Sequence, residues 1–322
     1  MTLERVTSIH PPRIWVIALI GLALALAACG GNRESALNKS DKELMAVTNQ
    51  SDFDKLIAEG DALWEDRAKA DSLKQAIAKW EEATQSATPN RSEDERRLAL
   101  ADLYSKIARG HYLWADAHMR FSGGDEDARE DAMRRKFNDG VTAAEKALAL
   151  YAPTFAEAIR QNKGVEESIP LLDKRAVPAM YWYASSIGKW ASLEGFAEIV
   201  SRKDAIKMMM DRVYELDPTY FHGGPPRYLG AFFARIPGFA GKDLNKSRAY
   251  FEESIKTSSG YLGTRVLMAQ DLATQLDDKA LYREQLEFVL KFDLSQAPDI
   301  AAENSFEQRK AKALLDDIDD KF

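Results

Sequence analysis

The chain has little cysteine, little histidine and no excess of positive charge. Its 322 residues include one cysteine, Cys29, which excludes an intramolecular disulfide and any site built from several cysteines. Lysine and arginine number 44 against 51 aspartates and glutamates, which gives a net charge of -7. Binding of nucleic acid requires a basic surface that neutralises phosphates, so we expect no nucleic-acid partner.

The chain also lacks the short motifs that carry common enzymatic chemistry. It has no Gly-x-Ser-x-Gly elbow, no His-Glu-x-x-His pair and no Gly-x4-Gly-Lys phosphate loop. His111 and His118 lie seven residues apart, but no carboxylate pair completes a metal-ligand set beside them. We therefore predict that the protein is not an enzyme and holds no metal and no cofactor.

The N-terminal segment carries an unbroken apolar run from Ile14 to Ala28 behind Arg5 and Arg13. Such a run is shorter than the roughly 17–25 residues of a membrane-spanning helix. A basic start followed by a short apolar run is typical of a secretory signal peptide. We predict a lipoprotein signal peptide at residues 1–28.

The residues that follow the apolar run suggest a lipid anchor. Leu26-Ala27-Ala28-Cys29 resembles a bacterial lipobox, in which the cysteine is acylated and becomes the first residue. Gly30 resembles the residue found in lipoproteins that are sorted to the outer membrane. We predict lipidation of Cys29 and a location on the periplasmic side of the outer membrane. An ordinary signal peptide or a short anchor, with an incidental cysteine, is the alternative.

The segment from residue 29 to residue 51 is polar and weakly patterned, so we predict a tether there. From Asp52 onward, apolar residues recur at spacings of three and four, and proline or glycine divides the pattern into successive helices. Alternating β-branched runs are missing. We predict an all-α domain over residues 52–322.

Five segments match parts of the tetratricopeptide pattern, in which small residues and an aromatic pack between two antiparallel helices. They are Ala76-x3-Trp80-x2-Ala83, Gly140-x3-Ala144-x2-Ala147, Ile206-x3-Met210-x2-Val213, Ser247-x3-Phe251-x2-Ser254 and Leu281-x3-Gln285-x2-Phe288. Only the last interval, of 34 residues, has the standard length. We predict an irregular tetratricopeptide-like helical repeat array with inserted helices or loops. An irregular helical bundle is the alternative.

Two segments hold more aromatic residues than a two-helix layer needs, namely residues 178–190 and 220–233. A helix that is apolar on all sides is buried or lines an interior channel. The two interpretations, core packing and a channel wall, both remain open for each aromatic residue.

Four motifs carry a family resemblance. They are Tyr181-Trp182-Tyr183, Gly188-Lys189-Trp190, Phe221-His222-Gly223-Gly224-Pro225-x-Arg227-x-Leu229-Gly230 and Pro237-Gly238-x2-Gly241-x-Asp243. Together with the lipobox and the helical repeats, they resemble the T-component (TatT) family of TRAP transporters. The resemblance implies a homotrimeric accessory subunit that docks the periplasmic solute-binding (P) subunit.

The resemblance also implies that an aromatic-lined pore binds or passes a hydrophobic small molecule, with or without a carboxylate. The candidate ligand-binding residues are Tyr181, Trp182, Trp190, Phe221, His222, Arg227, Phe232 and Phe233. Arg227 or Lys189 would donate a charge-assisted hydrogen bond to a carboxylate, or Arg227 would instead brace the glycine-rich turn by binding its carbonyls. A tetratricopeptide scaffold lipoprotein of envelope assembly is the alternative function, but it gives no reason for the aromatic segments.

Overall fold

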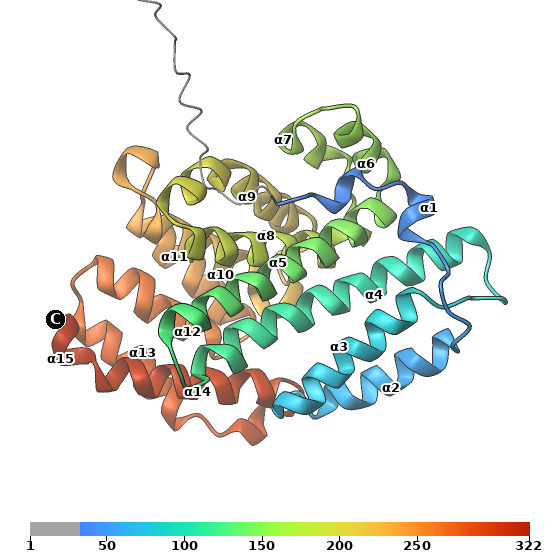
Figure 1. Ribbon diagram of the computed structural model, residues 1–322. Helices are drawn as coiled ribbons and strands as arrows, with labels where there is room; N and C mark the ends of the chain where they lie inside the picture. The colour runs from blue at the N-terminus through green and yellow to red at the C-terminus, as the bar shows by residue number, and fades with distance from the viewer. Residues whose placement is uncertain (1–32) are drawn as a thin grey trace, which may run out of the picture. The chain divides into compact units, whose positions relative to one another are not determined.

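Helices build almost all of the computed structural model, which describes residues 33–322 (Figure 1). The α-helices are α1 (Asp41–Leu44), α2 (Phe53–Glu65), α3 (Ala70–Thr84), α4 (Glu93–Leu113), α5 (Glu126–Tyr151), α6 (Pro153–Arg160), α7 (Val165–Ser168), α8 (Val177–Glu194), α9 (Phe196–Leu216), α10 (Tyr220–Arg235), α11 (Leu244–Thr257), α12 (Gly263–Leu267), α13 (Lys279–Lys291), α14 (Ala301–Asp316) and α15 (Ile318–Lys321). Residues 33–322 contain no strand. The all-α prediction is confirmed.

Short helical segments of other kinds connect or extend these helices. Two π-helical segments, η2 (Trp114–His118) and η7 (Met268–Ala273), continue α4 and α12 directly. The 3-10 segments include η1 (Ala36–Asn38), η3 (Met119–Phe121) and η6 (Gly238–Ala240). Because π-helical turns are rare and are frequent at functional sites, η2 and η7 mark two places of interest.

Consecutive helices pack in pairs, with α2 on α3, α4 on α5, α8 on α9 and α10 on α11. Small residues allow this close approach: a Cβ atom at Gly60 would lie 2.5 Å from the Trp80 ring. In the α10–α11 pair, the Ser247 hydroxyl donates to the Gly230 carbonyl at 2.7 Å. These contacts fit the small and aromatic positions of the predicted repeats, while the repeat arrangement itself stays a prediction.

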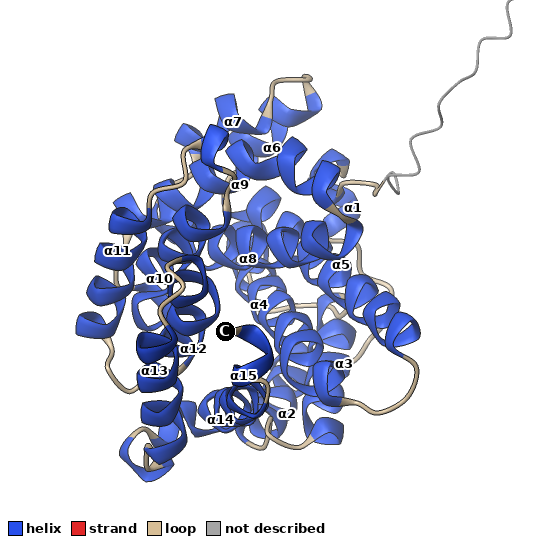
Figure 2. Cartoon of the chain, turned by 90° about the vertical axis from the view of Figure 1, so that its left-hand side faces the viewer, coloured by secondary structure: helices blue, strands red, loops and turns tan. Residues whose placement is uncertain are grey.

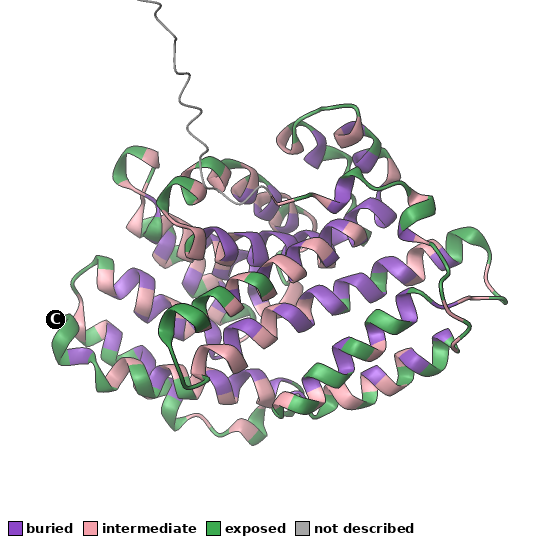
Figure 3. Cartoon of the chain, in the orientation of Figure 1, coloured by how far each residue is buried: buried purple, intermediate pink, exposed green. Residues whose placement is uncertain are grey.

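The buried apolar residues form a main core, a smaller separate core and a third cluster of Phe251, Met268 and Leu272. The main core reaches from Leu37 to Leu229, and α4, α5 and α8 carry buried residues along much of their length (Figure 3). The smaller core, which includes Leu262, Tyr282 and Ile318, lies within residues 262–318. We call residues 261–322 the C-terminal module, because they have an apolar core of their own.

Charged and aromatic side chains join the C-terminal module to the first helices, along a contact that we call the seam. Glu303 of α14 accepts hydrogen bonds from Arg67 at 2.9 and 3.0 Å and from Arg109 at 2.8 Å. The Phe306 ring packs against the His118 ring with centroids 4.7 Å apart. Figure 2 shows the resulting arrangement of residues 33–322, in which α14 lies next to α2.

The predicted tether differs from the structure over residues 33–51. Arg33 donates to both Glu145 oxygens at 2.6 and 2.8 Å, and the Ala36 amide donates to Glu145 at 2.8 Å. Leu37 and Leu44 are buried in the main core. This part of the chain therefore belongs to the domain, because Glu145 of α5 binds it and its apolar side chains are covered.

The remaining N-terminal predictions concern residues outside the described part of the chain. They are the signal peptide, the first residues of the tether and the lipidation of Cys29. Within residues 33–322, no helix has the length and apolar composition needed to span a bilayer.

Candidate functional site

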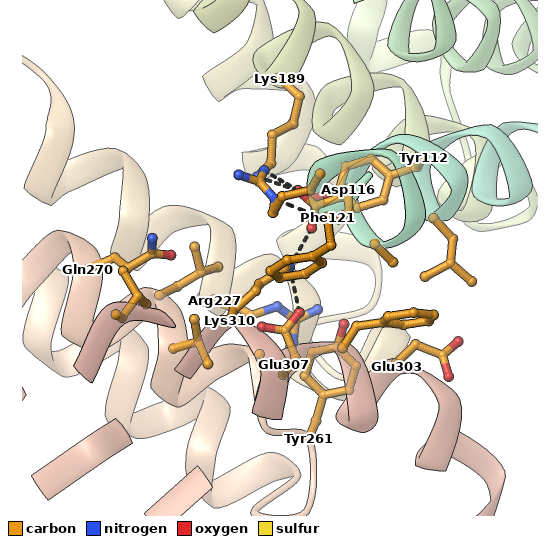
Figure 4. Close-up of a pocket in the computed structure, with 18 of the residues that line it drawn as sticks. Tyr112, Asp116, Phe121, Lys189, Arg227, Tyr261, Gln270, Glu303, Glu307 and Lys310 are labelled. Carbon is orange, nitrogen blue, oxygen red and sulfur yellow. Dashed lines mark hydrogen bonds and ion pairs between the residues drawn. The ribbon is translucent and has the colours of Figure 1, made fainter. Parts of the chain in front are cut away.

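A central cavity of about 560 Å³ lies between the C-terminal module and the helices α4, α8 and α10. Its size falls in the range of small-molecule sites. Figure 4 shows many of its residues, which come from both sides of the seam. The lining residues that matter below are Arg109, Tyr112, Asp116, Arg120, Tyr181, Trp182, Lys189, Phe221, Arg227, Arg235, Tyr261, Glu303, Phe306, Glu307 and Lys310.

An apolar cavity of about 320 Å³ adjoins the central one. Its walls come mainly from α8, α9 and α10, and include Ala191, Phe196, Ile199, Ile206, Ala231, Phe232, Ile236 and Pro237. The two cavities share Tyr112, Tyr181, Lys189, Arg227, Arg235 and Leu267 as walls. A lateral cavity of about 540 Å³ meets the central cavity from another side and shares Arg109 and Trp182 with it. The central cavity therefore adjoins a cavity at each of two places.

The central cavity has a cationic lining although the protein as a whole is acidic. Its wall contains Arg109, Arg120, Arg129, Lys189, Arg227, Arg235 and Lys310, against the acids Asp116, Glu303, Glu307 and Asp317. Most of these cations are paired with a carboxylate. The excess of cations over acids gives the cavity a positive potential, which favours an anionic ligand.

Asp116 lies at the centre of the largest charged cluster in this cavity (Figure 4). One carboxylate oxygen accepts from Arg120 at 2.7 Å and from Lys189 at 3.0 Å, and the other accepts from Lys310 at 2.6 Å. Burial alone would raise the pKa of Asp116, but these three cations outweigh it and hold the pKa well below its ordinary value. Asp116 is therefore a permanent anion in a buried place.

Asp271 is the buried aspartate of the other π-helical segment, η7. Among residues 33–322 it forms one ion pair, with Arg235, whose Nε donates to Oδ1 at 2.7 Å. The second oxygen, Oδ2, is buried and has no hydrogen-bond partner among the described residues. Burial raises the pKa of Asp271, and the single arginine only partly opposes this effect.

A left-handed turn at the start of α10 places Phe221 in the wall of the central cavity. Phe221, His222 and Gly223 have φ of 45°, 59° and 70°. Glycine adopts such angles readily, but for the other two residues they cost roughly 1–2 kcal/mol each. The turn points the Phe221 ring at Trp182, with centroids 4.8 Å apart. The strain is offset by packing and by the hydrogen bonds of Arg227.

Arg227 braces this turn, which was one of the two roles considered for it. Its guanidinium donates to the carbonyls of His222 at 3.1 Å and Phe221 at 3.2 Å, and to the Tyr181 hydroxyl at 2.9 Å. It also lies over the Tyr261 ring, 4.2 Å from the centroid. Among residues 33–322 no carboxylate pairs with Arg227. It therefore adds a buried, uncompensated positive charge to the cavity wall.

The structure brings some of the predicted ligand-binding residues together and separates others. Tyr181, Trp182, Phe221 and Arg227 line the central cavity, and Phe232 lines the apolar one. Three predicted residues line none of the three cavities: Trp190 packs against Arg202, His222 stacks on Tyr261, and Phe233 stacks on Tyr250. Sequence reasoning missed Asp116, Glu303, Glu307 and Lys310.

The two histidines of the central helices have structural partners. His111 is buried, and its Nε2 lies 3.2 Å from a Glu81 oxygen. His118 lies 3.0 Å from the Arg67 carbonyl and packs on Phe306 at the seam. In residues 33–322 no group of three metal-ligating side chains comes together.

The fold and the cavities define an all-α protein that surrounds a cationic central cavity with an apolar cavity beside it. The chain matches the family model of the TRAP transporter T-component over residues 73–322 and belongs to this family. The family is a periplasmic-side accessory subunit of a transport system and not an enzyme family. A comparison with curated proteins gives no match.

Proposed function

We propose that this T-component binds a hydrophobic small molecule that carries a carboxylate, and that it exchanges this ligand with the solute-binding P subunit of a TRAP transporter. The protein does so as a lipoprotein, anchored to the outer membrane through Cys29 and assembled as a homotrimer. Family membership supports the transport role and favours it over a scaffold of envelope assembly.

The observation that carries the proposal is the adjacency of a cationic cavity and an apolar cavity. An apolar tail in the smaller cavity gains roughly 25 cal/mol per Å² of surface removed from water. Lys189, Arg227 and Arg235 lie in the walls of both cavities, so a head group at this boundary meets cations while its tail stays among apolar side chains. An amphipathic anion matches both environments at once.

The lateral cavity supports passage of a ligand as well as binding. It shares Arg109 and Trp182 with the central cavity, which in turn shares six residues with the apolar cavity. A ligand that moves through these three spaces meets aromatic rings at each junction, among them Trp182 and Tyr181. This arrangement agrees with an aromatic-lined route through one protomer.

Ligand binding is tested on the mature chain, residues 29–322, with Cys29→Ser to prevent acylation. Organic extraction of the purified protein is expected to release a lipid-like molecule, and decanol is expected to change the tryptophan fluorescence. Phe232→Ala removes an apolar wall and should weaken decanol binding several-fold. Phe239→Ala is the matched control, because Phe239 is 83% exposed and lines none of the three cavities. Absence of both an extracted molecule and a fluorescence change would contradict the proposal.

Docking and anchoring are tested on the full chain in envelope extracts. Affinity capture is expected to recover a TRAP solute-binding subunit, whereas recovery of barrel-assembly proteins in its place would support the scaffold. Cys29→Ser should move the protein out of the outer-membrane fraction, since the described residues offer no membrane-spanning helix. Sedimentation equilibrium of the purified protein measures whether it is a trimer.

A further inference from the structure

The cluster around Asp116 contains more positive than negative charge. Arg120, Lys189 and Lys310 meet Asp116, and Lys310 also donates to Glu307 at 2.8 Å. Three cations therefore share two carboxylates. The neighbouring Asp271 is paired with Arg235, so it does not supply the missing negative charge. The cluster is one negative charge short.

The same cluster already holds its cations at the spacing that a carboxylate needs. The two oxygens of Asp116 accept three charge-assisted hydrogen bonds at 2.6 to 3.0 Å. The side chains of Lys189 and Arg120 are still 27% and 37% exposed, so both present unused donors toward the cavity. An external carboxylate beside Asp116 would find these donors in place.

We propose that the three cations around Asp116 form a subsite for the carboxylate of the ligand, and that the ligand competes with Asp116 for them. The inference rests on the proposed function, because it requires a ligand in the central cavity. Beyond that function, the inference states where the carboxylate of the ligand binds and which residue limits the affinity for the ligand. Asp116 weakens binding of the anion, since it occupies donors that the ligand would use.

The position of Lys189 connects this subsite to the apolar cavity. Lys189 lines both cavities, while Arg120 and Lys310 line only the central one. A carboxylate at Lys189 therefore directs its tail toward Phe232 and Ile236. The three cations also come from different elements, η3, α8 and α14, so a bound carboxylate ties the C-terminal module to the rest of the domain across the seam.

Asp116→Asn gives the most direct test, with decanoate and decanol as the two probes. Loss of the resident carboxylate should increase the affinity for decanoate by about tenfold, as expected for one added charge-assisted hydrogen bond. The affinity for decanol should stay the same. If decanoate binds Asp116→Asn no better than the unmodified chain, Asp116 only stabilises the fold and the inference is wrong.

Lys310→Gln keeps the inference testable if Asp116→Asn does not fold. It removes the excess positive charge and should lower decanoate affinity about tenfold without changing decanol affinity. Lys312→Gln is the matched control, because Lys312 lies on the same helix, is 69% exposed and pairs only with Asp316. Equal affinities of the two lysine variants for decanoate would overturn the subsite.

Hydrogen exchange gives a second readout that a purely structural cluster would not change. Decanoate should slow amide exchange in α14, and decanol should slow it less, because only the carboxylate contacts Lys310. The two probes also separate this inference from the proposed function. If neither probe binds, the proposed function fails; if both bind equally well and exchange in α14 does not differ, only the carboxylate subsite fails.

Discussion

The two π-helical segments each hold a buried aspartate, yet the two aspartates have opposite electrostatic environments. Asp116 in η2 meets three cations, and its pKa lies well below the ordinary value. Asp271 in η7 meets one arginine, and burial raises its pKa. Both carboxylates are almost equally buried, with exposed fractions of 7% and 5%. The number of nearby cations, and not the degree of burial, therefore decides the direction in which each pKa moves.

The same local structure, a π-helical turn, has different neighbours in the two places. In η2 it places Asp116 where η3, α8 and α14 meet. In η7 it places Asp271 against one helix, α10. Asp116 is therefore tied to the closure of the seam, and Asp271 is not. The following predictions test this contrast, starting with the largest expected effect.

Neutralising Asp116 should lower the free energy of unfolding more than neutralising Asp271. Asp116→Asn leaves three cations without their shared partner and should lower the free energy of unfolding by about 3 kcal/mol. Asp271→Asn removes one ion pair, with an Arg235 side chain that is 51% exposed and screened by solvent, so its cost should stay below about 1 kcal/mol. Urea denaturation of both variants measures the difference. Equal costs would show that the two sites do not differ as described.

The variant with the intermediate effect is Lys310→Gln, to be compared with Arg235→Gln. The Lys310 side chain is 13% exposed and pairs with two acids, so its loss should cost about 2 kcal/mol. The Arg235 side chain is 51% exposed and pairs with an acid whose pKa is already raised, so about 1 kcal/mol is expected. Thermal denaturation of the two variants checks the order, and a larger cost for Arg235→Gln would reverse the comparison.

The dependence of stability on pH should have opposite signs at the two sites. The pKa of Asp116 is lowered in the folded state, so its contribution is complete above the ordinary value of 3.8 and is lost as the pH falls toward the lowered pKa. The pKa of Asp271 is raised, so stability is complete below 3.8 and is lost as the pH rises through the raised pKa. With rising pH, Asp116→Asn should lose stability relative to the unmodified chain, and Asp271→Asn should gain it. Melting temperatures across about pH 3 to 7 test these signs.

Arg120→Gln should have the smallest effect of the set. The Arg120 side chain is 37% exposed and pairs with Asp116 within one helical stretch, so solvent screens the interaction. We expect a loss of about 0.5 kcal/mol, measured by urea denaturation beside Lys310→Gln. A loss as large as that of Lys310→Gln would mean that Arg120 and Lys310 contribute equally.

The helices and part of the cavity wall are predictable from the sequence. The spacing of apolar residues indicates helices, because only the helical period puts such residues on one face. The aromatic excess points to Tyr181, Trp182 and Phe221, which do line the central cavity. Trp190 and Phe233 carry the same local signal but lie elsewhere, because composition does not say which side of a helix faces a cavity.

The charged half of the site is not predictable in the same way. Asp116 and Lys310 lie in helices rich in charged residues, where a solvated face is the natural expectation. They meet because α14 lies against η2 although the two residues are 194 positions apart in the chain, and no local pattern encodes this contact. A π-helical turn also adds a residue to the helical period, so periodicity misplaces the side chains of η2. The packing of residues 33–51 against the domain is not predictable for a related reason, since Glu145 of α5 binds Arg33 from 112 positions away in the chain.

The seam has a consequence for the order in which this protein folds. The hydrogen bonds between Arg67 and Glu303 join residues 236 positions apart, and contacts of such long range form late because a large loop must close first. A folding intermediate that has only the main core therefore has no central cavity and no assembled cation cluster. The central cavity is therefore completed in the last step of folding, and it is the first feature to be lost when α14 detaches.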